Sequence, residues 1–227
     1  MMLEVRNLSL KTILKNVSFE ASGGEFVWLL GRNGAGKSSL LKCLAGVTSS
    51  FKGSVVIDQQ VSTNRNFSSL IGYVPQQGDF SSALSVSEAL SICSDQFSTN
   101  SHHAAHILEK VGLERSQSQL IEELSGGERQ KLLLALALVH DPKILLLDEP
   151  LAHLDLKAEE EILEILRSIK DKIIIMVSHD YVRAAQEASK ILFMHQGELT
   201  LLTPPLTAEK LKLLLLRDVP PLHVAYG

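Results

Sequence analysis

The chain has 227 residues, 45% of them hydrophobic, and a formal net charge of −4. A chain of this length buries one sizeable core and leaves room for a small inserted lobe. The slightly acidic balance argues against nucleic-acid binding, which requires a basic face. Two cysteines, Cys43 and Cys93, exclude a disulfide framework and indicate core thiols in a reducing compartment. Neither a signal peptide nor an apolar stretch long enough to span a bilayer is evident, so we expect a cytosolic chain that reaches a membrane only through a partner.

The first part of the chain has the pattern of β structure. Short apolar runs recur over residues 3–30, and the Ser-Gly-Gly sequence at 22–24 is typical of a turn. Two further short strands are predicted at residues 53–58 and 70–75, the second of them ended by Pro75. Between the first strands and these two lies the most informative stretch of the chain.

That stretch, residues 31–38, reads Gly-Arg-Asn-Gly-Ala-Gly-Lys-Ser and fits the phosphate-binding pattern G-x-x-x-x-G-K-[ST] at each fixed position. The apolar run 26–30 before it indicates a buried strand, and residues 39–45 after it have helical spacing. Glycines let backbone N–H groups turn inward toward anionic oxygens, and the helix N-terminus adds partial positive charge. Lys37 can reach the outer phosphates of a ligand, and the Ser38 hydroxyl can bind Mg²⁺.

Residues 79–125 differ in character, because they are rich in Ser, Gln and His and mostly helical by pattern. The sequence from Ser85 to Glu88 has the S-x-x-E form of a capping box, and a second helix is predicted at 104–111, ended by Gly112. We interpret this region as an inserted helical lobe. His102 and His106 are four residues apart and would share a helix face, with His103 adjacent; this leaves two alternatives, a metal-binding pair without other ligands nearby or the simpler solvated polar face.

The α/β pattern then resumes. Helices are predicted at 126–139 and 157–168, and they lead to strands at 144–147 and 173–177. These strands are apolar throughout, which is typical of strands buried on both faces in a parallel sheet covered by helices. After Pro204 and Pro205, one short helix is predicted at about 207–216.

Two carboxylates, Asp148 and Glu149, follow the strand at 144–147 directly. Ligands of open α/β sheets bind at this carboxyl end of the strands. Asp148 is therefore a candidate Mg²⁺ ligand, direct or through water. Glu149 can orient and deprotonate a water molecule.

Residues 124–128, Leu-Ser-Gly-Gly-Glu, again join small residues to a helix N-terminus and predict a second phosphate grip. At this point the chain resembles the ATP-binding subunits of ABC transporters, whose signature sequence is LSGGE or LSGGQ followed by a basic helix. Here the signature continues Arg-Gln-Lys at 129–131. The resemblance covers roughly residues 2–203, with the motifs in the family's order.

The resemblance implies roles for residues that match the family's motifs. Gln76 looks like the glutamine-loop residue that contacts Mg²⁺ and the attacking water, with Gln77 as the alternative register. His179 looks like the switch histidine on the γ-phosphate, and Glu149 and Lys37 complete the implied catalytic set. The implied Mg²⁺ ligands are Ser38, Gln76 and Asp148. The implied ATP contacts within the chain are Gly31, Arg32, Asn33, Gly34, Ala35, Gly36, Lys37, Ser38 and Ser39.

The resemblance also implies partners. Ser125, Gly126, Gly127 and Asp155, the last in the D-loop, are expected to act in trans on the ATP of a second, head-to-tail copy or related ATPase subunit. A transmembrane permease, and for an importer a solute-binding protein, would complete an assembly on the cytoplasmic face of the membrane. The short chain and the sequence at 176–180 look most like ATPase subunits of metal-ion or metal-chelate importers. An exporter subunit and a non-transport ABC ATPase are the alternatives.

We therefore expect an α/β P-loop NTPase of ABC type, with a mainly parallel core sheet, an N-terminal antiparallel β subdomain and an inserted helical subdomain. The core would comprise residues 1–78 and 126–203, the helical subdomain 79–125, and a C-terminal helix and tail 204–227. In one respect the chain departs from the family: residues 8–14 lack the aromatic residue that stacks on adenine. Such stacking contributes about 1–3 kcal/mol, so its loss would weaken nucleotide affinity without abolishing phosphate binding.

Overall fold

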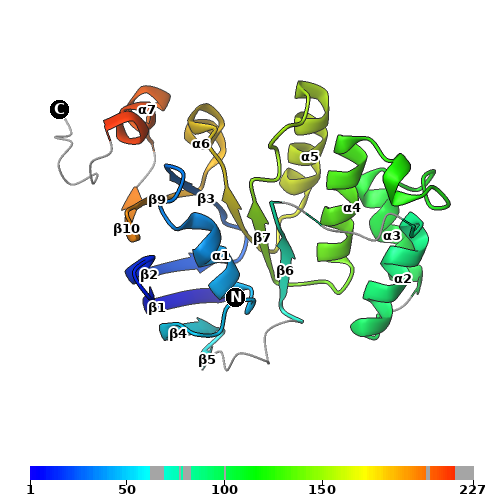
Figure 1. Cartoon of the computed structure of the whole chain (residues 1–227), viewed down its shortest axis with the longest axis horizontal. Helices are drawn as coiled ribbons and strands as arrows, with labels where there is room; N and C mark the ends of the chain where they lie inside the picture. The colour runs from blue at the N-terminus through cyan, green and yellow to red at the C-terminus, as the bar shows by residue number, and fades with distance from the viewer. Residues whose placement is uncertain (62–68, 77, 79–82, 100, 203–204, 218–227) are drawn as a thin grey trace.

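The computed structural model describes residues 1–61, 69–76, 78, 83–99, 101–202 and 205–217. Its centre is a six-stranded sheet of order β10-β9-β3-β8-β7-β6, in which only β10 runs antiparallel to its neighbour (Figure 1). The strands of this sheet are β3 (Phe26–Gly31), β6 (Ile71–Val74), β7 (Ile144–Asp148), β8 (Ile173–Val177), β9 (Lys190–His195) and β10 (Glu198–Leu202). The predicted mainly parallel core sheet is confirmed.

A second sheet comes from the N-terminal part of the chain. It is antiparallel, with the order β2-β1-β4-β5, and consists of β1 (Met2–Leu10), β2 (Leu14–Ser22), β4 (Lys52–Ile57) and β5 (Gln60–Val61). Helix α1 (Lys37–Leu44) shares a hydrophobic core with both sheets, because its apolar side chains belong to the same cluster as alternate residues of β1, β2, β4, β3 and β7. The predicted N-terminal antiparallel sheet is therefore confirmed as well.

The alternation of side chains along a strand explains why the central strands are apolar throughout. In β7, Ile144 and Leu146 face the α1 side, whereas Leu145 and Leu147 belong to the core on the opposite side. Successive side chains of a strand point to opposite faces, so a strand covered on both faces needs apolar residues at every position. The carboxyl ends of these strands carry the site described below.

The opposite face of the sheet is covered by α4 (Gly126–Leu138), α5 (Leu156–Ser168), α6 (Tyr181–Glu187) and α7 (Ala208–Arg217) (Figure 1). Helices α2 (Val86–Gln96) and α3 (Ser101–Val111) pack beside α4 and form the lobe, which ends in a short 3-10 turn, η1 (Ile121–Glu123). The predicted capping box at Ser85 is confirmed, since Ser85 and Glu88 cap α2 reciprocally. Because α4 packs on both the lobe helices and β6, the expected boundary at residue 125 falls at the start of a helix that both parts share.

Several elements differ from the sequence-based expectation. Helix α6 and strands β9 and β10 were not predicted, although β9 lies directly beside β3. The Gln77 alternative, residues 79–82 of the lobe and residues 218–227 of the tail lie outside the described residues. Within the described part of the chain, no helix is both long and apolar enough to cross a membrane.

Candidate functional site

The phosphate-binding loop lies between β3 and α1, as its sequence predicts. Gly34 and Gly36 have φ values of 79° and 107°, which favour glycine and let the loop turn tightly before α1. The Lys37 ammonium is held within the loop, donating hydrogen bonds to the carbonyl oxygens of Gly31 at 2.7 Å and Arg32 at 3.0 Å. Burial lowers the pKa of Lys37, although the nearby carboxylates of Glu149 and Asp148 act against this shift. A partly desolvated cation in a glycine-rich loop at a helix N-terminus fits an anionic ligand.

Ser38 and Asp148 meet at the start of α1, although they are distant in the sequence. The Ser38 hydroxyl donates a hydrogen bond of 2.9 Å to Asp148 Oδ1. Burial raises the pKa of Asp148, while the hydrogen bond from Ser38 opposes that rise. A hydroxyl oxygen and a carboxylate oxygen at this separation are the hard oxygen donors that Mg²⁺ prefers, so the residues present fit that cation.

Glu149 is the point at which three loops converge. Its Oε1 lies 2.9 Å from His179 Nε2, and its Oε2 accepts a hydrogen bond of 3.1 Å from Gln76 Nε2. These three residues follow β7, β8 and β6, which are adjacent parallel strands. All three were candidate catalytic residues, and the fold brings them together at one edge of the sheet.

The backbone of Glu149 is also unusual. Its φ is 52°, in the left-handed region that a non-glycine residue rarely adopts. Its N–H donates to the Val177 carbonyl, and its carbonyl accepts from the Ala152 N–H. Residues held in such a conformation cluster at functional sites, because the surrounding structure must offset the strain. The strained turn places the carboxylate between Gln76 and His179 instead of in line with β7.

Gln76, Glu149 and His179 line one open cavity of about 570 Å³ together with residues of the phosphate-binding loop. Its walls also contain Ile13, from the turn between β1 and β2, whose side chain is 42% exposed. Ile13 is the functional candidate that sequence reasoning missed: the segment was noted for lacking an aromatic residue, yet its aliphatic residue still reaches the site. The cavity is lined by Ile13, Asn33, Gly34, Gly36, Lys37, Ser38, Ser39, Gln76, Glu149 and His179.

We expect Ile13→Tyr to tighten ATP binding about tenfold, because stacking of an aromatic ring on a base contributes about 1–3 kcal/mol. Isothermal titration with ATP and with inorganic triphosphate separates base stacking from phosphate binding. Val61→Tyr is the matched control, since Val61 is exposed on β5 and does not line the cavity. Equal ATP affinity in the parent and Ile13→Tyr would mean that the adenine does not lie against this turn.

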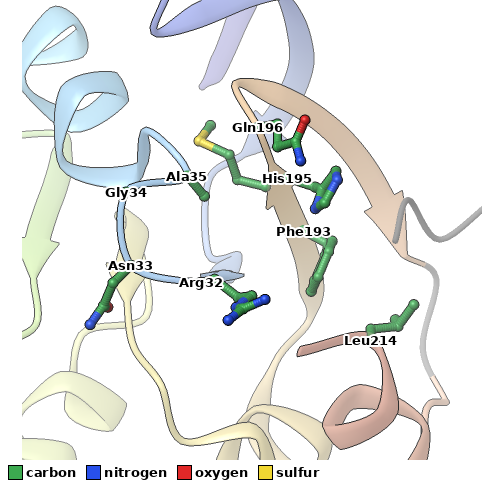
Figure 2. A pocket seen from close by; sticks show the side chains of 9 residues that line it. Arg32, Asn33, Gly34, Ala35, Phe193, His195, Gln196 and Leu214 are labelled. Carbon is green, nitrogen blue, oxygen red and sulfur yellow. The ribbon is translucent and has the colours of Figure 1, made fainter. Parts of the chain in front are cut away.

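Arg32 lies apart from the other loop side chains. It lines a second cavity, of about 300 Å³, on the other flank of the loop, together with Phe193 and His195 of β9 and Leu214 of α7 (Figure 2). Asn33 and Gly34 form part of the walls of both cavities. Arg32 was one of the predicted ATP contacts. Its backbone belongs to the phosphate-binding loop, but its side chain lines the second cavity and not the cavity that contains Lys37.

The residues expected to act in trans gather elsewhere on the chain. Ser125 caps α4 through a capping box with Glu128, and Asp155 caps α5 by accepting a hydrogen bond of 2.8 Å from the Ala158 N–H. The Ser125 hydrogen bonds lower the pKa of Glu128. Both helix N-termini line a cavity of about 290 Å³ that includes Gly126 and Gly127 and shares no residue with the Lys37 cavity. The two groups of predicted site residues therefore lie in two separate cavities of the chain.

The histidines of the lobe do not form a metal site among the described residues. His106 lies 3.9 Å from Glu109, and His103 Nε2 is buried without a hydrogen-bond partner. Nothing is described of the His102 side chain. Within the described part of the chain, no group of three or more His, Cys, Asp or Glu residues could hold a metal ion.

Several known proteins are similar in sequence to this chain. A profile of the ABC transporter family matches residues 14–152, which is more than half of the chain. The zinc import ATP-binding protein ZnuC of Acinetobacter baylyi is 35% identical over 191 residues, covering 82% of this chain and 69% of that protein. The lipoprotein-releasing system ATP-binding protein LolD of the same organism is also 35% identical, over 200 residues, covering 82% of this chain and 87% of that protein.

A solved structure, described as the ATP-binding subunit of an ABC transporter, superposes with a TM-score of 0.84. It covers 95% of this chain and 99% of that chain at 23% identity, so this likeness concerns the fold alone. The equal identity to a zinc importer subunit and to a lipoprotein-releasing subunit shows that sequence similarity does not distinguish the transported substrate.

Proposed function

This chain belongs to the ABC transporter family of ATP-binding, ATP-hydrolysing subunits, and we propose that it drives a solute across a membrane through a partner transmembrane permease. The observation that supports ATP hydrolysis, which would power this transport, is the convergence of Gln76 and His179 on Glu149 beside the phosphate-binding loop. A carboxylate in this position can act as a general base toward a water molecule. A loop that binds phosphates but lacks such a carboxylate would suit nucleotide binding alone.

In the proposed mechanism, Lys37 and the loop backbone from Gly31 to Ser39 bind the ATP phosphates. Ser38, Asp148 and the amide oxygen of Gln76 would hold Mg²⁺, which when bound supplies positive charge to the phosphates. Glu149 orients the attacking water and accepts its proton, and His179 holds the γ-phosphate in line. Positioning and electrostatic stabilisation provide most of the rate acceleration in this class of reaction.

We further propose that the active unit is a head-to-tail dimer with a second copy or a related ATPase subunit. Ser125, Gly126, Gly127 and Asp155 would complete the partner's nucleotide site. The separation of these residues from the Lys37 cavity supports this arrangement, because both cavities are open and no residue lines both of them. Binding of ATP would favour the closed dimer and hydrolysis the open one. The lobe at 79–125, with Gln76 at its entry, would transmit this motion to the permease.

For the transported solute we propose a metal ion or metal chelate, taken up with the help of a solute-binding protein. The similarity to a zinc import subunit supports this assignment. The equal similarity to a lipoprotein-releasing subunit supports an exporter as the second candidate. In either case the chain would lie on the cytoplasmic face of the membrane, attached to its permease.

Two measurements test these proposals. Phosphate release by the purified chain tests hydrolysis, and affinity purification from solubilised membranes tests for a permease. We expect both a measurable ATPase activity and a co-purified multi-span protein. Reconstitution of that pair in vesicles, with Zn²⁺ uptake and lipoprotein extraction measured side by side, discriminates the two solutes. Hydrolysis without any membrane partner would instead indicate a non-transport ABC ATPase.

A further inference from the structure

Arg183 of α6 joins two carboxylates from different segments. Its Nη2 lies 2.9 Å from Glu159 Oε2 on α5, and its Nε lies 3.4 Å from Asp180 Oδ2, just before α6. The side chains of Arg183 and Glu159 are only 19% and 23% exposed. Arg183 Nη1 is buried without a hydrogen-bond partner, a state that costs free energy. The guanidinium is therefore held in one geometry by its two carboxylates rather than by complete hydrogen bonding.

Both carboxylates belong to segments that reach the candidate site. Asp180 follows His179 directly, and it caps α6 by accepting hydrogen bonds from the N–H groups of Val182 and Arg183. Glu159 lies in the first turn of α5, where its N–H donates to the carbonyl oxygen of Asp155 at 2.9 Å. Arg183 thus connects the segment that carries Asp155 to the segment that carries His179.

The space between this connection and Glu149 is not tightly packed. A cavity of about 170 Å³ lies there, and its lining includes Glu149, His179, Glu159 and Asp180. Loosely packed surroundings do not by themselves hold a side chain in place. The ion pair between Arg183 and Glu159 spans from the His179 segment to α5 at this point, and the pair between Arg183 and Asp180 ties the guanidinium to the residue after His179.

We propose that Glu159, Arg183 and Asp180 form a positioning bridge that sets His179 against Glu149 and transmits the placement of Asp155 to it. The bridge rests on the proposed function, because Asp155 is there assigned to the contact with a second chain. Binding of the partner at the N-terminus of α5 would then change the position of His179 in the same chain. Arg183 contacts neither nucleotide nor water in this scheme, so it is a positioning residue.

The alternative is that Arg183 simply ties α5 to α6. The same two helices offer a matched control at their other ends, where Arg167 of α5 lies 2.5 Å from Glu160 and 2.7 Å from Glu187. These carboxylates raise the pKa of Arg167, with Glu187 contributing most. Arg167 lines none of the cavities that contain Glu149, His179 or Asp155. An ion pair therefore also joins α5 to α6 away from the candidate site.

The test compares Arg183→Met with Arg167→Met in the full chain, with kcat, KM, ATP affinity and Tm measured for each. We expect Arg183→Met to lower kcat about 10- to 100-fold, since a displacement of about 1 Å in a catalytic group has an effect of this size. Its ATP affinity should stay within about twofold, because the Lys37 cavity is untouched. Arg167→Met should lower Tm comparably and leave kcat within about twofold of the parent.

A double-mutant cycle with Glu159→Gln sharpens the comparison. If the pair acts as a unit, the double variant loses no more kcat than Arg183→Met alone, whereas independent effects would multiply. Arg183→Lys keeps the charge and should recover part of the lost rate. Should Arg183→Met fail to fold, Glu159→Gln and Arg183→Lys undergo the same comparison.

Equal kcat in Arg183→Met and Arg167→Met, or multiplicative effects in the cycle, would overturn the bridge. A parent protein without ATPase activity would instead contradict the proposed function, so the two failures are distinguishable.

Discussion

Glu149→Gln is expected to reduce ATP turnover about 100-fold or more, since general-base catalysis contributes about 10²- to 10⁴-fold. An amide of the same shape can still accept a hydrogen bond from Gln76 but cannot take a proton from water. The phosphate-binding loop is unchanged, so ATP should bind with the parent affinity. Phosphate release and titration with ATP measure the two quantities on the same preparation.

The matched control for this substitution is Glu164→Gln, which removes one carboxylate from the exposed side of α5. Its turnover should equal that of the parent. The variant Glu149→Gln should also accumulate as an ATP-bound dimer, which size-exclusion chromatography detects. Turnover by Glu149→Gln at the parent rate would show that a different group accepts the proton.

Gly126→Asp is expected to abolish ATP turnover while leaving ATP binding to the single chain intact. At Gly126 an added Cβ would meet its nearest atom, Leu154 Cδ2, at 3.9 Å, which is ordinary contact. The substitution therefore leaves room for folding, whereas at Gly127 a Cβ would approach Ala158 to 2.9 Å. A carboxylate at the start of α4 would repel the phosphates that this helix N-terminus is proposed to grip in the partner.

Mixing two inactive variants tests whether the site is shared between chains. In the proposed dimer, Lys37→Met would inactivate a chain's own phosphate loop, and Gly126→Asp would inactivate the surface that the chain offers to its partner. A mixed dimer retains one intact site, so random pairing of independent sites should recover about a quarter of the parent activity. Ser87→Asp, which adds a carboxylate to the exposed first turn of α2, is the control and should leave turnover unchanged. Absence of recovery in verified mixed dimers would contradict a shared site.

Much of the secondary structure could be predicted because its signals are local. A few consecutive residues are enough to predict the phosphate-binding loop, its flanking strand and helix, and the capping box of α2. The structure confirms these elements. By contrast, β9 has a short apolar core that does not distinguish a strand from a helix without its partner. Its place was decided by pairing with β3, whose residues lie more than 150 positions earlier.

The sequence alone predicted which groups form the candidate site: the lysine and serine of the phosphate loop, the paired acids at the end of β7 and the small residues at the start of α4, because each motif is a short run with its own chemistry. Only the tertiary structure decided how they meet. Glu149 contacts Gln76 and His179, which are 73 and 30 residues away, and Arg183 lies between Glu159 and Asp180. Strand order and helix packing bring these groups together, and no local pattern encodes contacts between segments so far apart along the chain.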